Sequence, residues 1–331
     1  MVDGKNLMQY KIKKISGDAS FREFYTIEKN SKFTILVKAN KDKFRNLIIY
    51  AAINELLIKN KIKAPKLIQE YFVKNMMEIE NLGSYSFLEH IKNKKNKFSD
   101  YKKIVELIIK LQNINFKKDI KFGNSKIRIK KHNLSELHKE SDLFFDWYLK
   151  NNSKKKEFKK NKNKIKKELN NLYKKLYFQD TSFVHRDFHA SNIMIKNSKY
   201  GLIDSQDALK GNLLYDVASL IDDVRIKLPL KLKSSLFSYY LSKTTKIKKN
   251  KEELLAKNDF DILSIQRNLK ILGIFVRLFK RDHKSNYLKF LPYTWKLLEL
   301  RLKNPIFFNL RFLLDKAVSK KNRKKFNSYD Y

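Results

Sequence analysis

Cysteine is absent from the 331-residue chain, which excludes disulfide bonds and thiolate metal sites. Long apolar runs are missing as well, because the stretches at 47–57 and 271–279 are short or interrupted by polar residues, so no segment resembles a membrane span. The first residues, MVDGKNLMQYKIKK, lack the apolar core of a signal peptide. We therefore expect a cytoplasmic protein without a membrane partner.

Acidic residues are scarce: 34 Asp and Glu stand against 74 Lys and Arg, a formal net charge of +40. Such a charge suggests an anionic partner, because Lys and Arg release counterions from phosphates. The excess is spread along the chain, however, mostly as Lys accompanied by Asn and Ile, a composition that an AT-rich genome also produces. We expect a solvated basic surface on a monomer, without a nucleic-acid partner.

The N-terminal part reads as a small sheet with one helix. Segments rich in β-branched and aromatic residues, separated by polar turns, predict strands at 10–15, 21–28, 32–38, 66–72 and 76–80. Apolar residues recur at helical spacing over 43–60 and predict a helix there. Asn81-Leu82-Gly83 then reads as a hinge, so residues 1–82 are expected to form an N-terminal nucleotide-binding lobe.

The remainder, residues 83–331, is expected to form a larger, mainly helical lobe for catalysis and substrate binding. Helical periodicity predicts helices at 87–92, 100–113 and 135–149, in a Lys-rich stretch that reaches 177, and from 214 onward. Strand-like segments return only at 182–184, 193–195 and 200–203. The fold class predicted from this pattern is α+β and bilobal, with a small antiparallel sheet in the first lobe.

One motif carries chemistry: His185-Arg186-Asp187 followed by Asn192 matches H-R-D-x-x-x-x-N, and Asp204 follows twelve residues later. Phosphoryl transfer needs one carboxylate to accept or orient the acceptor hydroxyl proton, and an amide oxygen and a second carboxylate to hold Mg²⁺ at the phosphates of ATP. Taken singly, His185 and His189 are better explained as core histidines, and Asp187 as a turn carboxylate. The joint pattern instead predicts an ATP-dependent small-molecule kinase, with Asp187 as the base and Asn192 and Asp204 as Mg²⁺ ligands.

A phosphate cradle is expected between the first two strands, where small residues allow backbone N–H groups to approach phosphates. The candidate residues there are Ser16, Gly17, Asp18, Ala19 and Ser20, although the same segment alone reads as an ordinary turn. Lys38 on the third strand is a candidate to neutralise the phosphates, with Glu55 as its candidate partner. Glu80, just before the hinge, completes the expected nucleotide-binding set.

These motifs resemble the aminoglycoside phosphotransferase and choline kinase-like superfamily, whose loop reads H-x-D-x-x-x-x-N and whose metal strand carries Ile-Asp. More narrowly, the chain is similar to the bacterial anomeric N-acetylmuramate/N-acetylglucosamine kinases over residues 17–22, 142–149, 204–223 and 266–278. The resemblance implies a protein-kinase-like fold and transfer of the γ-phosphoryl group of ATP to the anomeric hydroxyl of an N-acetylated amino sugar. The product would be a sugar 1-phosphate that serves cell-wall recycling.

The chain departs from the family at two positions near these motifs. Ser205 stands where an aromatic residue usually follows the metal-binding Asp, and Val37-Lys38 replaces a frequent Met-Asp, so a phosphate role for Lys38 does not carry over from the resemblance. The sugar site is less defined by the residues themselves. Trp147 offers an aromatic face, although such residues are more often core, and the candidate hydrogen-bonding residues are His189, Gln206, Asp207 and Arg267.

Two alternatives stay open. The first is a kinase for another small alcohol or amine, such as choline, homoserine or an aminoglycoside, but cationic acceptors need an acidic pocket wall and carboxylates are few outside the motif. The second is a non-catalytic nucleotide- or RNA-binding relative, whose function would be the positive charge. Such a protein has no chemical need for Asp187, Asn192 and Asp204, and no RNA-binding motif is evident.

Overall fold

The structure is a computed structural model that describes residues 11–15, 22–41, 44–152 and 155–324. The chain forms two compact units, each assembled from separate stretches. The first unit contains residues 1–95, 114–130 and 185–208, and the second contains residues 96–113, 131–184 and 209–331. The expected lobes, 1–82 and 83–331, divide the chain by sequence position and stay a prediction.

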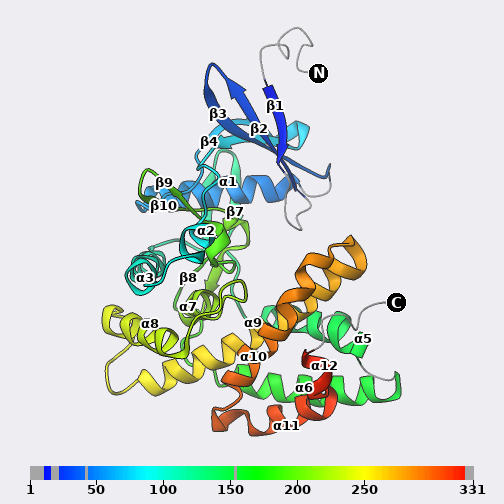
Figure 1. The fold of residues 1–331 in the computed structure, drawn as a ribbon. Coiled ribbons are helices and arrows are strands. Elements are labelled where there is room, and N and C mark those ends of the chain that lie inside the picture. The colour runs from blue at the N-terminus through cyan, green and yellow to red at the C-terminus, as the bar shows by residue number, and fades with distance from the viewer. Residues whose placement is uncertain (1–10, 16–21, 42–43, 153–154, 325–331) are drawn as a thin grey trace. The chain divides into compact units, whose positions relative to one another are not determined.

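The first unit contains a five-stranded antiparallel sheet in the order β1-β2-β3-β5-β4 (Figure 1). Its strands are β1 (Lys11–Ile15), β2 (Arg22–Lys29), β3 (Lys32–Ala39), β4 (Leu67–Tyr71) and β5 (Met76–Glu80). Asn30 and Ser31 join β2 to β3 with φ values of 48° and 58°, the two positive values that a type I′ hairpin turn requires. All five strands expected in this part of the sequence are confirmed, with ends within one residue of those expected.

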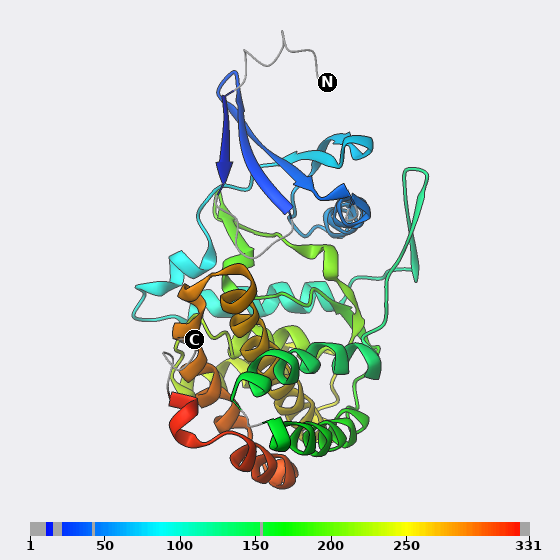
Figure 2. The ribbon, with the colours of Figure 1, turned by 90° about the vertical axis from the view of Figure 1, so that its right-hand side faces the viewer.

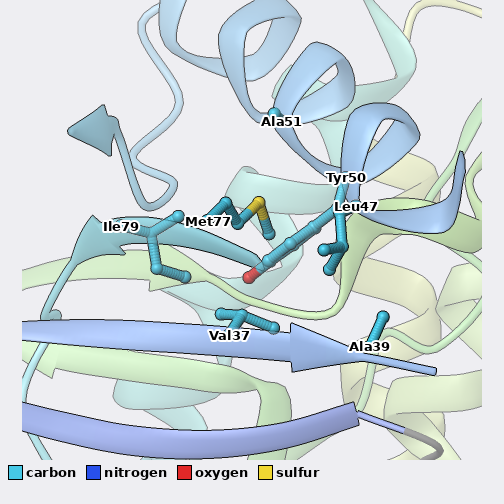
Figure 3. Close-up of a cluster of buried hydrophobic side chains, with 7 residues drawn as sticks. All are labelled: Val37, Ala39, Leu47, Tyr50, Ala51, Met77 and Ile79. Atoms are coloured by element: carbon cyan, nitrogen blue, oxygen red, sulfur yellow. The ribbon is translucent and has the colours of Figure 1, made fainter. Parts of the chain in front are cut away.

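Helix α1 (Phe44–Lys59) covers one face of this sheet, as Figure 2 shows with the helix seen end-on. The shared core consists of Val37, Ala39, Leu47, Tyr50, Ala51, Met77 and Ile79. In Figure 3 the side chains of Tyr50 and Met77 lie between α1 and the strand that carries Val37. Leu47, Tyr50 and Ala51 recur at the spacing of one helix face, and burying a large apolar side chain contributes about 1.5–3 kcal/mol. The helix expected at 43–60 is therefore confirmed.

The rest of the first unit consists of short elements. They are η3 (Phe72–Lys74), α2 (Phe87–Lys92), β6 (Asp119–Phe122), β7 (Ser125–Arg128), η5 (Ala190–Asn192), β9 (Ile193–Lys196), β10 (Lys199–Leu202) and η6 (Ser205–Asp207). The expectation that strands return only at three later segments is wrong, because β6 and β7 form a hairpin of their own (Figure 2). Its turn contains Gly123 at φ 51°, and the Gly-Asn pair there was a signal for a hairpin.

The second unit is mainly helical and contains one two-stranded sheet, in which β8 pairs with β11. The short strand β11 is a third strand, after β6 and β7, that the sequence pattern did not predict. The elements of the second unit are α3 (Phe98–Gln112), α4 (Leu134–Leu143), η4 (Phe144–Leu149), α5 (Lys150–Asn152), α6 (Lys155–Lys174), β8 (Ser182–Val184), β11 (Leu209–Gly211), α7 (Leu214–Ile221), α8 (Leu230–Lys243), α9 (Glu253–Asp282), η7 (Ser285–Phe290), α10 (Leu291–Arg301), η8 (Pro305–Phe307), α11 (Phe308–Ala317) and α12 (Lys320–Lys324).

The long helix α9 packs directly on the end of α4. The segment expected as one regular helix at 135–149 changes there from α4 to the π-helical turn η4. A Cβ atom on Gly273 would lie 2.2 Å from the backbone carbonyl of Leu143, so the two backbones are in contact and only glycine fits. The fold class is confirmed as α+β, with a small antiparallel sheet in the N-terminal region and a larger helical C-terminal part. Among the described residues, no helix combines the length and apolar character that a membrane crossing requires.

Candidate functional site

The hairpin of β9 and β10 carries both candidate metal ligands at its open end. Lys196 pairs with Lys199 next to the turn, and the antiparallel ladder runs from there to the open end of the hairpin. Beyond the ladder, the N–H group of Ile203 donates to the carbonyl of Asn192 at 3.1 Å. Asn192 and Asp204 are twelve positions apart in sequence, yet this pairing brings them to one end of the same small sheet.

The loop before this hairpin holds Asp187 on a fixed backbone. Its carbonyl oxygen accepts hydrogen bonds from the N–H group of His189 at 3.1 Å and from Nδ2 of Asn192 at 3.0 Å. Arg186 has a left-handed φ of 78°, a conformation that costs energy and that is concentrated at functional sites. His185 is fully buried and packs edge-on against Phe188, with ring centroids 6.0 Å apart. The half-buried carboxylate of Asp187 is therefore mounted on a well-braced loop.

Asn192 is oriented by the same loop. Because its Nδ2 donates to the Asp187 carbonyl, Oδ1 is the atom of the amide that is suited to bind a cation. Ring atom Nε2 of His189 lies 3.4 Å from Nδ2, so His189 adjoins this candidate ligand. The carboxylate of Asp204 is 35% exposed and supplies further oxygen atoms. Hard oxygen atoms of this kind suit Mg²⁺, so the residues present fit the expected ion.

Asp204 is held by a residue that sequence reasoning did not place in the site. Its Oδ1 accepts a hydrogen bond from Nη2 of Arg22 at 2.8 Å, and Nη1 of Arg22 donates to Oε1 of Gln206 at 3.0 Å. Nε2 of Gln206 in turn donates to Oδ2 of Asp207 at 3.3 Å. The only signal for Arg22 in the sequence was its place at the end of the segment 17–22 that resembles the family.

The packing beneath Asp204 replaces the aromatic residue that the family usually has. Ser205 is fully buried, and its hydroxyl donates to Oδ1 of Asn54 on α1 at 2.6 Å. Nδ2 of Asn54 donates to the carbonyl of Pro65 at 3.1 Å. Burial, and next the Asp204 carboxylate, raise the pKa of Tyr50 to about 12, so its hydroxyl stays protonated at neutral pH. The departure at Ser205 is therefore offset by the hydrogen bond that Ser205 donates to Asn54 on α1.

Replacing this serine tests the arrangement. Ser205→Ala is expected to lower the free energy of unfolding by about 1–3 kcal/mol, because the change leaves the buried Oδ1 of Asn54 without the donor that Ser205 supplies. The measurement is urea unfolding followed by circular dichroism, with the exposed Ser234→Ala on α8 as a matched control. An equal effect of the two substitutions would contradict the role of the buried pair.

The site-bearing hairpin is also docked on two other segments of the same unit, one at Lys63 and one at residues 81–85. The N–H group of Ile195 donates to the carbonyl of Tyr85 at 2.8 Å, and that of Leu202 donates to the carbonyl of Lys63 at 2.8 Å. Nζ of Lys196 donates to the carbonyl of Asn81 at 2.6 Å. Backbone pairing on both edges therefore fixes the hairpin that ends in Asn192 and Asp204.

The expected nucleotide-binding residues are only partly described. The cradle, residues 16–20, lies outside the described residues. Lys38 is exposed on β3 opposite Glu23, and Glu55 pairs with Lys59 one helical turn away, so the described residues show no Lys38–Glu55 ion pair. Glu80 ends β5, where its N–H group donates to the carbonyl of Lys66 at 2.8 Å. Nucleotide binding by these residues stays a prediction.

Two candidate sugar-binding residues belong to the second unit. Trp147 lies in η4 and is half-buried, whereas its neighbour Tyr148 is core and accepts a hydrogen bond from Nε1 of Trp295 at 2.7 Å. Arg267 on α9 is buried, with its guanidinium group 4.9 Å from the ring centroid of Tyr215. The other candidates, His189, Gln206 and Asp207, lie beside the candidate metal ligands in the first unit.

Known proteins that are similar in sequence to this chain carry the name of a sugar kinase. An N-acetylmuramate/N-acetylglucosamine kinase of Pseudomonas aeruginosa is 24% identical over 288 residues, which cover 86% of this chain and 81% of the relative. The kinase of the same name from Neisseria meningitidis is 24% identical over 280 residues, which cover 84% of this chain and 81% of the relative.

Solved structures share the fold at low sequence identity. A choline kinase from Cryptosporidium parvum superposes with a TM-score of 0.63 at 11% identity, over 93% of this chain and 94% of the kinase. A thermostable mutant of an aminoglycoside phosphotransferase, solved with ADP and hygromycin B, gives a TM-score of 0.62 at 10% identity, over 91% of this chain and 96% of the other. The predicted kinase-like fold is thereby confirmed. Residues 11–248 match the sequence profile of the phosphotransferase enzyme family, and because this match spans more than half of the chain, the protein belongs to that family.

Proposed function

We propose that the protein is an ATP-dependent kinase that phosphorylates the anomeric hydroxyl of an N-acetylated amino sugar, N-acetylmuramate or N-acetylglucosamine. The product would be the sugar 1-phosphate, which would serve cell-wall recycling. The observation that carries the proposal is the braced loop of Asp187 beside the paired ends of β9 and β10, because it provides a base and two oxygen ligands for phosphoryl transfer. The family membership and the names of the relatives support the same class of reaction.

Each residue of this loop has a proposed task. Bound Mg²⁺ would be held by Oδ1 of Asn192 and the carboxylate of Asp204 and would neutralise charge on the phosphates. Asp187 accepts the proton of the sugar hydroxyl and orients its oxygen toward the phosphorus atom. An anomeric hydroxyl is more acidic than an ordinary alcohol, so a carboxylate of ordinary basicity suffices. Alignment of the reactants then supplies most of the rate enhancement.

The acceptor is proposed from the relatives, since the fold alone does not select it. Solved proteins with the same fold include kinases named for choline and for aminoglycosides, whereas the sequence relatives over most of the chain are named for amino sugars. Gln206 and Asp207 offer polar groups beside Asp204 for a sugar hydroxyl or acetamido group. We therefore assign them, with His189, to the acceptor, and propose Trp147 and Arg267 as further contacts.

Release of ADP from Mg·ATP tests the acceptor. The panel is N-acetylmuramate, N-acetylglucosamine, N-acetylgalactosamine, choline, homoserine and kanamycin. We expect acceptor-dependent ADP release with N-acetylmuramate or N-acetylglucosamine and background release with choline, homoserine and kanamycin. Preference for choline or kanamycin would overturn the acceptor assignment. Background ADP release with every compound of the panel would favour a non-catalytic relative. Salt-sensitive RNA binding would then be measured in its place.

A further inference from the structure

Arg22 is a buried cation at the candidate metal site that the proposed reaction leaves without a role. Its side chain is only 4% exposed. An arginine is rarely buried to this extent unless it is paired. Its guanidinium group lies 5.4 Å from the ring centroid of Phe24 and 5.3 Å from that of Tyr50. These two rings restrict the guanidinium group to one place beside Asp204.

The hydrogen bonds of Arg22 use the fork of its guanidinium group. Nη2 contacts Oδ1 of Asp204 at 2.8 Å, and Nη1 contacts Oε1 of Gln206 at 3.0 Å, so one rigid plane fixes both side chains. Among the described residues, Oδ2 of Asp204 accepts no hydrogen bond, and the carboxylate is 35% exposed. Arg22 therefore holds one oxygen atom of the carboxylate and leaves the other one available.

The backbone of Asp204 also needs support. Its φ of 60° lies in the left-handed region, which is unfavourable for residues other than glycine and persists only where the surroundings enforce it. Arg22 begins β2, 182 positions before Asp204, so the contact joins the sheet of the first unit to the metal-binding turn. Among the described residues of this unit, Arg22 is a charged group that connects the two.

We propose that Arg22 is a positioning residue for metal binding: it fixes the Asp204 carboxylate by Oδ1 so that Oδ2 is presented to Mg²⁺. The inference rests on the proposed function, since it takes Asp204 as the metal ligand. Two possible roles of Arg22 predict opposite changes in metal affinity when its charge is removed. If its positive charge only repelled the metal, its removal would tighten metal binding, whereas loss of a positioning residue weakens it. Partners that orient metal ligands typically contribute about 10–100-fold in affinity.

Calorimetry of ADP binding, with Mg²⁺ and with EDTA, separates the two views. The ratio of the two dissociation constants measures how much the metal contributes. In Arg22→Gln we expect this ratio to fall by about 10-fold or more, with the affinity for ADP in EDTA unchanged. Arg22→Lys should fall between the wild type and Arg22→Gln, because an ammonium group can keep the Asp204 contact but not the fork to Gln206. Arg45→Gln, an exposed arginine on α1, is the control and should match the wild type.

The outcomes distinguish this inference from the proposed function. If the wild type binds ADP equally with and without Mg²⁺, the proposed function fails. If the wild type and Asp204→Asn differ as expected but Arg22→Gln keeps the wild-type ratio or increases it, only the role of Arg22 is overturned. Adding Arg22→Gln to Asp204→Asn should cause no further loss, because the two residues act as one unit. If Arg22→Gln does not fold, Arg22→Lys decides: a ratio at least threefold below the wild type supports the proposal, and a smaller change overturns it.

Discussion

Asp187→Asn is expected to lower the turnover number for the amino-sugar acceptor by about 100- to 10,000-fold, the usual contribution of a positioned general base. The amide keeps the size of the side chain but cannot take the hydroxyl proton. The backbone carbonyl of Asp187, which accepts hydrogen bonds from His189 and Asn192, is unchanged by the substitution. We therefore expect the affinity for Mg·ADP to change by no more than a few-fold.

Steady-state kinetics and calorimetry on the same preparations check this result. Asp119→Asn is the matched control, because it removes a carboxylate from a surface ion pair with Arg128 in the β6–β7 hairpin, and such pairs contribute little. Its turnover number should equal that of the wild type. Near-normal turnover in Asp187→Asn, or in Asp187→Ala, would show that Asp187 is not the base.

Asp204→Asn is expected to remove most of the contribution of Mg²⁺ to nucleotide affinity, by at least about 100-fold, the upper range for residues that only support a metal ligand. The substitution keeps an oxygen atom that can accept the hydrogen bond of Arg22, so the turn should retain its fold. The buried Arg22 then loses its ion pair with Asp204, and we expect a decrease in thermal stability.

The measurement is again calorimetry of ADP with Mg²⁺ and with EDTA. Asp315→Asn, a surface carboxylate that pairs with Arg323 in the second unit, serves as the charge-matched control. The affinity for ADP in EDTA should be the same in all three proteins. An unchanged response to Mg²⁺ in Asp204→Asn would remove Asp204 from the metal site and leave Asn192 without its proposed fellow ligand.

Sequence alone predicted the regular elements where local pattern determines them. The strands of the N-terminal sheet are rich in β-branched and aromatic residues and are separated by turn-forming residues, and α1 repeats its apolar positions at helical spacing. The predicted ends of these elements therefore lie within one residue of the observed ends. The β6–β7 hairpin was missed because its strands have four residues each, two of them charged in each strand, which leaves few apolar positions to show a pattern. The π-helical turn η4 was missed because its apolar positions suit a regular helix equally well.

The candidate site was predicted only as far as spacing along the chain allows. Asp187, Asn192 and Asp204 follow from a linear motif, and the pairing of β9 with β10 brings the last two together. Arg22 acts through a contact 182 positions away, which no local pattern shows. Glu55 illustrates the converse. Its own helix offers it Lys59 at the favourable i+4 position, whereas the sequence analysis expected Lys38 on strand β3 as its partner.

The compensation at Ser205 likewise depends on a distant residue. Nothing around position 205 in the sequence indicates that Asn54 on α1, 151 positions earlier, supplies its hydrogen-bond acceptor. From the sequence alone, a small polar residue in place of a buried aromatic one therefore suggests a loss of packing, because its hydrogen-bond partner is not known. The structure shows a hydrogen-bonded pair in its place, with Asn54 also tied to Pro65.

The most direct test of the central claim is phosphorus NMR of the product formed from Mg·ATP and N-acetylglucosamine labelled with carbon-13 at the anomeric position. If the protein transfers phosphate to the anomeric hydroxyl, the product's phosphorus signal will be split by the labelled carbon, and with Asp187→Asn the same signal will grow at least about 100-fold more slowly. N-acetylmuramate labelled in the same way gives the parallel experiment. A phosphate ester without that splitting, or no ester from either sugar, would contradict the account.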